Sequence, residues 1–243
     1  MKYTTPNGQT YRLFEDMTEQ PHLLVAGATG SGKSVVVNGI ITTLLYRFPT
    51  QAQFILIDPK RVELSPYKSL PHTLKYASEP DDMIYALEYA MMITENRYRD
   101  MEARHLRKYD KGDVYVIIDE FADLMTTQRR KVAPLIQRLA QIGRAARVHI
   151  ILCTQTPIAK VLPTEIKCNF DSRVGLRTRS AQDSRNILGV SGLETLPVFG
   201  EGIYMTPIGN THYKIPYVNE TEQNRLIKWW TDQIPKKKWW QFW

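Results

Sequence analysis

Residues 23–34 read LLVAGATGSGKS, and this stretch decides the fold class. Its first four residues, Leu23–Ala26, are apolar and predict a short buried strand. Gly27–Ser34 follows and fits the pattern G-x-x-x-x-G-K-[ST], in which a glycine-rich loop joins a strand to a helix. The helical spacing of apolar residues over Val35–Tyr46 predicts that helix. We therefore expect an α/β fold built around this strand–loop–helix unit.

Each part of the loop suits an anionic phosphate group. Glycines let the backbone turn so that its N–H groups point at phosphate oxygens, and the following helix presents the positive end of its dipole. Lys33 is expected to reach the β and γ phosphates of ATP, and Ser34 to bind Mg²⁺. The predicted nucleotide-binding residues are Gly27, Ala28, Thr29, Gly30, Ser31, Gly32, Lys33, Ser34 and Val35.

Beyond the loop, apolar runs alternate with helical patterns. The runs at Phe54–Ile57, Val114–Ile118 and Val148–Cys153 predict strands. Helices are predicted from a cap at Ser78 to about His105, and over Arg130–Ala145. Continuous apolar strands separated by helices indicate a mainly parallel central sheet with helices on both faces. Ligands of such sheets bind at the carboxyl ends of the strands.

The chain is expected to hold one domain over residues 21–234. A short hairpin or extension in residues 1–20 precedes it, around the turn signal Pro6-Asn7-Gly8. A basic and aromatic tail, residues 235–243, follows it.

The last third of the domain carries weaker signals. Ser180 and Asn219 each stand three residues before an acid, which predicts the starts of two more helices. Strands are expected near Ile203–Met205 and Tyr213–Pro216. Trp229-Trp230 is predicted to form the buried face of the final helix.

The amino-acid composition limits the classes of protein to which this chain can belong. The net charge of +7 is compatible with a nucleic acid or an anionic membrane as partner. The two cysteines, Cys153 and Cys168, exclude a disulfide scaffold and a cysteine-rich metal site. No apolar run reaches the roughly 18 residues of a membrane-spanning helix, and no secretory signal is visible. We expect a cytoplasmic location.

Two acids end the strand predicted at Val114–Ile118. An apolar strand followed by Asp119 and Glu120 fits the second motif of nucleotide hydrolases, with Asp119 holding Mg²⁺. Glu120 would then polarise the attacking water. Gln155 ends the next strand and could sense the γ-phosphate. Arg144 lies at the end of the helix that precedes this strand. It is either a solvated charge at the helix end or a group that reaches the nucleotide of a neighbouring subunit.

Taken together, these segments resemble the motor domain of the FtsK/SpoIIIE DNA translocases, within the FtsK–HerA group of RecA-like P-loop ATPases. The matching segments are PHLLVAG (21–27), GKSV (32–35), IDPKRVEL (57–64), IDEFADLM (118–125), RAA (144–146), TQ (154–155), IK (166–167) and DSR (183–185). The resemblance runs from about residue 8 to about residue 232. It is specific because the motifs occur as an ordered set.

The resemblance implies ATP hydrolysis, with Mg²⁺, coupled to movement along double-stranded DNA by a homo-hexameric ring with ATP between subunits. It implies that Arg144 is the trans-acting arginine finger and Gln155 the sensor, and it places Lys60 near the nucleotide.

The resemblance also implies which residues touch DNA. In the family, basic residues after the Thr-Gln strand line the pore. Lys167 and Arg185 match those positions, and Arg177 and Arg179 lie nearby. Such phosphate contacts are independent of DNA sequence. Thr156 and Ala181 stand where the family usually has basic residues, so a different grip on DNA is expected.

Other readings stay open at this point. A genome-packaging or conjugative-transfer motor, from a phage, plasmid or mobile element, would use the same chemistry. A secretion ATPase of the FtsK-like kind would act on a polypeptide, and a nucleotide-controlled scaffold would hydrolyse little. The last eight residues, KKKWWQFW, suit an anionic membrane interface. They equally suit a protein partner or neighbouring subunit, or a terminus with no special role.

Overall fold

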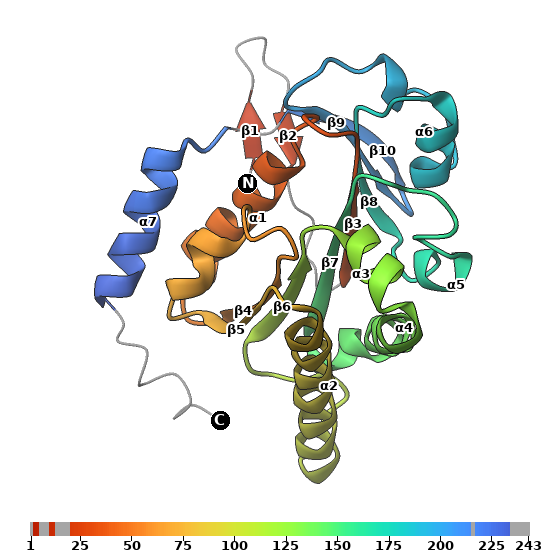
Figure 1. Cartoon of the computed structure of the whole chain (residues 1–243). Helices are drawn as coiled ribbons and strands as arrows, with labels where there is room; N and C mark the ends of the chain where they lie inside the picture. The colour runs from red at the N-terminus through yellow and green to blue at the C-terminus, as the bar shows by residue number, and fades with distance from the viewer. Residues whose placement is uncertain (1, 5–9, 13–19, 215–216, 234–243) are drawn as a thin grey trace.

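The computed structural model describes residues 2–4, 10–12, 20–214 and 217–233 (Figure 1). Its elements in chain order are β1 (Lys2–Thr4), β2 (Thr10–Arg12), β3 (His22–Ala26), α1 (Lys33–Arg47), β4 (Ala52–Ile57), the 3-10 helix η1 (Ser65–Ser69), β5 (Thr73–Ala77), α2 (Pro80–Ala103), β6 (Asp113–Ile118), α3 (Phe121–Thr127), α4 (Arg129–Ala146), β7 (Val148–Thr154), α5 (Thr164–Lys167), β8 (Ser172–Leu176), α6 (Ala181–Leu188), the 3-10 helix η2 (Leu193–Thr195), β9 (Glu201–Thr206), β10 (Gly209–Lys214) and α7 (Glu220–Gln233). From β3 to α6 strands alternate with helices, except that α4 directly follows α3, as the apolar pattern predicts in outline.

The central sheet has the strand order β10-β9-β8-β3-β7-β6-β4-β5. The six strands from β8 to β5 are parallel, and β9 and β10 join antiparallel at the other edge. Every residue of β3, β4, β6 and β7 is buried. These strands form continuous apolar runs because both faces of the sheet are covered. The expected α/β fold with a mainly parallel sheet is confirmed.

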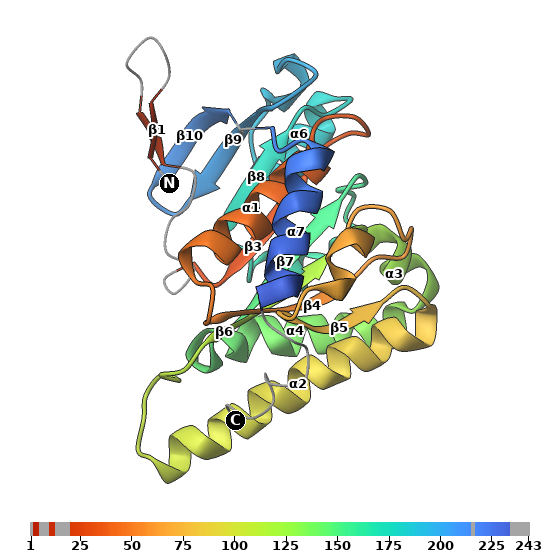
Figure 2. The ribbon, with the colours of Figure 1, turned by 90° about the vertical axis from the view of Figure 1, so that its left-hand side faces the viewer.

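Helices cover both faces of this sheet (Figures 1 and 2). Alternate residues of a strand point to opposite faces, so Leu24 and Ala26 join the core under α2, α3 and α4. Leu23 and Val25 join the core under α1 and α7. The site residues described below therefore rest on a sheet that is packed from both sides.

Several local predictions hold. The Ser180 hydroxyl caps α6 by accepting a hydrogen bond from the Asp183 N–H at 3.1 Å. At α7, Asn219 Oδ1 accepts from the Glu222 N–H at 2.9 Å, and the Glu222 carboxylate accepts from the Asn219 N–H at 3.3 Å. This is the reciprocal capping box that the spacing predicts. β1 pairs antiparallel with β2, as a hairpin requires.

Other local predictions are wrong by one residue or more. Helix α2 begins after Glu79 rather than Ser78, because Pro80 occupies the first helical position and makes its predecessor the cap. The last strand is Gly209–Lys214 rather than Tyr213–Pro216, and residues 215–216 lie outside the described part. Trp230 is 8% exposed but Trp229 is 52% exposed, since consecutive helical residues point about 100° apart.

None of the helices in the described part of the chain combines the length and the apolarity needed to cross a bilayer.

Candidate nucleotide site

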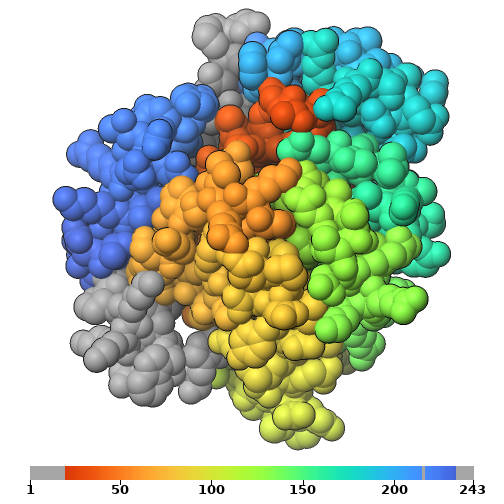
Figure 3. Space-filling view, viewed as in Figure 1, coloured from red at the N-terminus to blue at the C-terminus, as the bar shows by residue number. Residues whose placement is uncertain are grey.

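Four loops meet at the carboxyl edge of the parallel strands. The loop after β3 is Gly27–Gly32, and residues that follow β4, β6 and β7 lie beside it (Figure 1). Hydrogen bonds join the loop to the ends of β7 and β8: the Gly27 N–H donates to Thr154 O at 3.3 Å, and the Ala28 N–H to Arg177 O at 2.8 Å. In the space-filling view, the red-orange surface of the loop lies between orange residues of the first third and cyan residues of the last (Figure 3).

The loop after β3 has the geometry of a phosphate-binding turn. Gly30 and Gly32 adopt φ values of 75° and 99°, a region that side chains disfavour. A Cβ on Gly27 would lie 2.6 Å from Ser31 Oγ and 2.7 Å from Leu176 Cβ. Among the described atoms, Ser31 Oγ is buried without a hydrogen-bond partner. A tight turn with an unsatisfied donor at the start of α1 fits an anion with several oxygen acceptors.

Lys33 is the first residue of α1 and is 8% exposed. Its ammonium donates to Gly27 O at 3.0 Å and to Ala28 O at 3.3 Å, so it lies across the loop. Burial lowers the pKa of Lys33, and the charges of Glu120 and Asp119 oppose that shift. The charge therefore sits at the loop, where phosphate oxygens would replace the carbonyls as its partners.

Asp119 follows β6 and is 8% exposed. Burial, together with the negative charges of Asp58, Glu63 and Glu120, raises the pKa of Asp119 from 3.8 to about 7. Asp58 adds a buried carboxylate oxygen, Oδ1, that has no hydrogen-bond partner among the described residues. Such crowded, dehydrated carboxylates fit a divalent cation, which favours oxygen ligands. Ser34, at the start of α1, and Asp119 are the residues that would hold Mg²⁺.

Glu120 is buried and held by three groups. Its carboxylate accepts from Thr154 Oγ1 at 3.0 Å and from the Gln155 N–H at 3.1 Å. Lys60 Nζ lies 3.5 Å from Glu120 Oε2. The Gln155 side chain in turn accepts from Thr29 Oγ1, in the phosphate loop, at 2.6 Å. The predicted base, the predicted sensor and the loop are thus joined in one hydrogen-bonded chain, and Lys60 lies beside the base.

Arg144 is exposed in the last turn of α4, before the amino end of β7. The phosphate loop lies at the carboxyl end of β3, which runs parallel to β7. Seven strand residues at about 3.3 Å each separate Arg144 from its own chain's site by roughly 20 Å. Any contact of Arg144 with a nucleotide must therefore be made in a neighbouring chain.

The four predicted DNA contacts fall into two places. Lys167 Nζ donates to Asn186 O at 3.2 Å, at the last turn of α6, beside the exposed Arg185. Arg177 and Arg179 lie at the other end of α6, just after β8. Arg177 is half-buried beside the phosphate loop, and Arg179 is exposed. Their DNA contacts stay predictions.

The sequence analysis expected Asp58-Pro59-Lys60 and Thr154-Gln155 near the nucleotide, and the structure adds specific contacts for Thr154, Asp58 and Glu63. The Thr154 hydroxyl donates a hydrogen bond to the Glu120 carboxylate, and the negative charges of Asp58 and Glu63 help to raise the pKa of Asp119. Asp58 also accepts from the Leu64 N–H at 3.0 Å, which holds the turn after β4. A polar residue directly after an apolar strand was the available signal, but only the strand order shows that these ends meet.

Comparison with known proteins identifies the family. The profile of the FtsK/SpoIIIE family matches residues 9–114 and 109–159, more than half of the chain. The chain belongs to the FtsK/SpoIIIE family. It is 38% identical to the DNA translocase FtsK of Rickettsia typhi over 89% of this chain, and 38% identical to that of Chlorobaculum tepidum over 92%. It spans about a third of the length of these relatives, 35% and 31%.

Two solved structures show the same fold as this chain. The FtsK/SpoIIIE chain superposes on the pCW3 conjugation coupling protein TcpA with a TM-score of 0.79, 23% identity, and coverage of 94% of this chain and 70% of TcpA. It matches the type VII secretion ATPase EccC of Thermomonospora curvata with a TM-score of 0.78, 22% identity, and coverage of 93% and 30%. These likenesses concern the fold.

Proposed function

We propose that the chain is the ATP-hydrolysing motor of a double-stranded DNA translocase. One observation carries the proposal: Glu120 is joined through Gln155 to Thr29 of the phosphate loop. Through this link, the general base can respond to the presence of the γ-phosphate. Such an arrangement suits ATP hydrolysis rather than nucleotide binding alone. The DNA substrate rests on the relatives named DNA translocase FtsK.

Each site residue has a task in this proposal. The loop N–H groups and Lys33 bind the phosphates, and Ser34 and Asp119 hold Mg²⁺, which neutralises phosphate charge. Glu120 accepts a proton from the attacking water. Its position is fixed by Thr154 and the Gln155 N–H.

The working assembly is proposed to be a homo-hexameric ring around DNA. The family resemblance implies the ring and its six subunits. The position of Arg144, roughly 20 Å from its own site, supports a head-to-tail contact between subunits. In a closed ring every subunit can supply Arg144 to its neighbour, because a head-to-tail interface repeats around the ring. Arg185, Arg179, Arg177 and Lys167 would contact DNA phosphates. Of these, Arg179 and Arg185 are exposed.

Steady-state ATP hydrolysis with and without long linear duplex DNA, at low and physiological salt, tests the proposal. Lys33→Ala is the blank. Stimulation by duplex that is lost in Lys33→Ala would support a DNA-dependent motor. An ATP hydrolysis rate that duplex DNA does not change at any salt concentration would favour a polypeptide substrate instead. This would fit the secretion ATPase whose fold this chain shares.

A motor for conjugative transfer or genome packaging is the nearest alternative. The coupling protein TcpA gives the observation in its favour, since its fold matches 94% of this chain. The same hydrolysis assay would be positive for such a motor. Its docking partner, rather than its chemistry, would differ.

The proposed motor domain covers residues 21–234, with the hairpin in residues 1–20 as an appendage. The tail, residues 235–243, lies outside the described residues. We propose that the protein is cytoplasmic and that its tail contacts a membrane surface or a protein partner. Co-sedimentation with anionic vesicles, with and without residues 236–243, tests the membrane contact, and equal binding would rule it out.

A further inference from the structure

The segment between η2 and β9, residues 196–200, lies beside the phosphate loop. β9 runs antiparallel to β8, and Gly202 near its start pairs with Leu176 at the end of β8. The start of β9 is therefore at the carboxyl edge of the parallel strands. Gly200 N lies 3.5 Å from the position that a Cβ on Gly32 would take, and Gly32 directly precedes α1. Figure 1 shows the chain entering β9 close to the amino end of α1.

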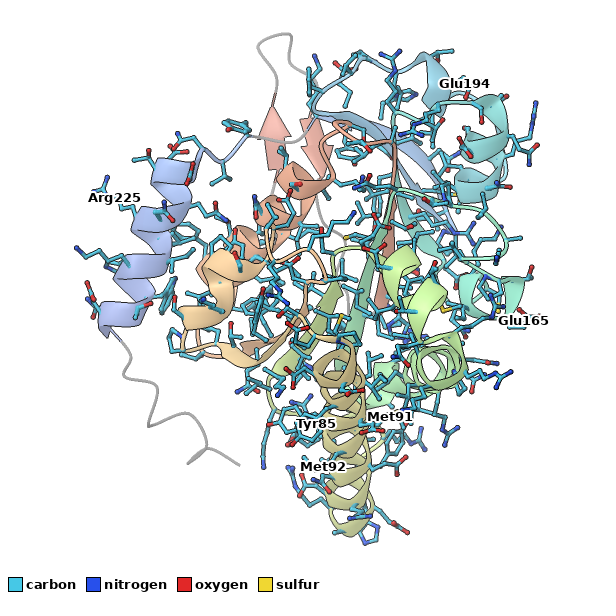
Figure 4. The ribbon with its side chains drawn as sticks, viewed as in Figure 1. Tyr85, Met91, Met92, Glu165, Glu194 and Arg225 are labelled. Atoms are coloured by element: carbon cyan, nitrogen blue, oxygen red, sulfur yellow. The ribbon has the colours of Figure 1, made fainter. Side chains whose placement is uncertain are left out.

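Both ends of this segment are held by the fold. Leu193 of η2 is buried, and its carbonyl accepts from the Thr178 N–H, two residues after β8, at 3.4 Å. The Glu194 carboxylate accepts from the Gly192 N–H at 2.9 Å. Figure 4 shows Glu194 at the rim of the molecule, away from α1. The segment therefore runs from the rim at η2 inward to the phosphate loop at Gly200.

The inner end of the segment carries an uncovered aromatic side chain. Phe199 is 74% exposed and Val198 is 46% exposed, whereas Leu196 belongs to the core and is 8% exposed. A single exposed apolar residue is ordinary on a protein surface. Phe199 differs because the next residue, Gly200, lies against the phosphate loop. A ligand held by that loop is therefore within reach of the ring.

The site itself indicates which part of ATP would meet Phe199. Glu120 and Gln155, which are expected at the γ-phosphate, follow β6 and β7 on one side of β3. β8 and β9 lie on the other side of β3. The end of the triphosphate that carries the nucleoside points away from the γ-phosphate. It therefore points toward β8 and β9, where Phe199 lies.

An aromatic ring suits a nucleotide base at this place. Both are flat π-systems, and stacking of a base on an aromatic side chain typically changes the affinity by roughly 5- to 150-fold. The phosphate loop supplies the contacts to the charged part of ATP. The Phe199 ring supplies an apolar surface for the uncharged part.

We propose that Phe199 is a base-binding residue of the nucleotide site and that its ring stacks on the adenine of bound ATP. The proposal rests on the nucleotide site of the proposed function, and does not depend on DNA as the substrate. Stacking uses the π-face that every base has. Phe199 therefore adds affinity for nucleoside triphosphates in general and does not select ATP over GTP.

Isothermal titration calorimetry of the full chain with ATP and with inorganic triphosphate, each with Mg²⁺, tests the proposal. Only ATP carries a base. All chains carry Glu120→Gln, so that bound ATP is not consumed. Phe199→Ala should weaken ATP binding by roughly 5- to 150-fold and leave the binding of inorganic triphosphate unchanged. Phe199→Tyr, which keeps the ring, should bind ATP as tightly as the chain with Phe199.

Ile208→Ala is the matched control. Ile208 is 87% exposed and lies in the turn between β9 and β10, at the opposite end of β9 from Phe199. Its removal should change the affinity for neither ligand. Equal ATP affinities in Phe199→Ala and Ile208→Ala would overturn the proposal. An equal loss for ATP and inorganic triphosphate in Phe199→Ala would also overturn it, since Phe199 would then only shape the phosphate loop.

Sedimentation velocity of the same chains excludes a contact between subunits. If Phe199→Ala loses ATP affinity only at concentrations where the chain with Phe199 assembles, the ring contacts a neighbouring copy and the proposal fails.

The outcomes also separate this proposal from the proposed function. A selective loss of ATP binding in Phe199→Ala, together with a hydrolysis rate that duplex DNA does not change, would support the base contact and contradict the DNA translocase. Binding of neither ATP nor inorganic triphosphate by the chain with Phe199 would contradict both.

Discussion

At the scale of single residues, the site is governed by carboxylates that are buried close together. Glu120 is satisfied by Thr154, the Gln155 N–H and Lys60. Asp119 has no such set of donors, and its pKa is raised to about 7. The two neighbouring acids therefore suit different tasks: hydrogen bonds fix the position of Glu120, and Asp119 gains most from a cation.

Glu120→Gln should collapse turnover and retain ATP binding. The amide keeps the size of the side chain but cannot accept the water proton, and a loss of on the order of 10²–10⁴-fold in kcat is expected. The comparison of kcat with the dissociation constant of ATP checks this. Thr154→Val keeps the carboxylate and removes one of its donors, so a smaller loss is expected. Unchanged turnover in Glu120→Gln would support a scaffold that binds nucleotide.

Asp119→Asn should stabilise the protein in metal-free buffer, and more so at pH 8 than at pH 5.5. The native pKa of Asp119, about 7, is above its unfolded value of 3.8, so the native state binds the extra proton and loses stability as pH rises between these values. Asn removes this penalty, and the gain should be larger at pH 8 by roughly 1–2 kcal/mol.

Urea unfolding at the two pH values measures this effect, with the exposed Asp171→Asn as control. A gain that is equal at both pH values would contradict the titration of Asp119. Addition of Mg²⁺ and ATP should abolish the stability gain of Asp119→Asn. The bound cation stabilises the native state of the protein that keeps the Asp119 carboxylate, and the Asn variant lacks this ligand.

At the scale of elements, the end of α4 that carries Arg144 is held by its neighbours. Tyr98 of α2 donates to Ile142 O at 2.9 Å, and the Tyr109 N–H donates to Ala145 O at 2.8 Å. Arg97, also on α2, is 2% exposed and donates to Ala146 O at 2.8 Å. Carbonyls that would end a helix unsatisfied are thus paired, and Arg144 projects from a fixed turn.

Arg97→Met should destabilise the fold by about 2–4 kcal/mol, because it removes the donor of the Ala146 carbonyl and the contact with the Tyr109 ring. Arg99→Met, on the exposed side of the same helix, should cost less than about 0.5 kcal/mol. Chemical denaturation of the two variants measures the difference. Similar stabilities would show that the α2–α4 contact does not depend on this guanidinium.

At the scale of the whole molecule, the sheet separates the two halves of the proposed catalytic site. The phosphate loop and both acids lie at its carboxyl edge, and Arg144 lies at the opposite edge of the same strands. Each chain therefore has a nucleotide site at one edge of the sheet and an arginine that can reach a neighbour's nucleotide at the other edge. This arrangement suits a closed ring in which each nucleotide lies between subunits.

Mixing two inactive variants tests the ring. Arg144→Ala and Glu120→Gln should each lose hydrolysis alone, but a mixture should recover part of it, since some interfaces join an intact Glu120 with an intact Arg144 from the neighbour. Hydrolysis of the mixture, measured with duplex DNA, checks this. A mixture no more active than its components, with assembly shown by sedimentation, would remove Arg144 from the catalytic site.

The sequence by itself determined the fold class and the main site residues. Gly27–Ser34 and the acids after Ile118 are contiguous motifs, and their chemistry can be recognised without coordinates. The apolar runs predicted the central strands because both faces of those strands are buried. The caps at Ser180 and Asn219 were equally readable, since a helix start depends on four neighbouring residues.

Only the tertiary structure decided the remaining features. β5 and β8, TLKYA and SRVGL, carry no clear apolar pattern, and their strand form comes from pairing with β4 and β3. Thr154 and Asp58 gain their roles because parallel strand ends meet, which places residues far apart in sequence side by side. Trp229 and Trp230 are adjacent in sequence, yet only the packing of α7 determines which one is buried.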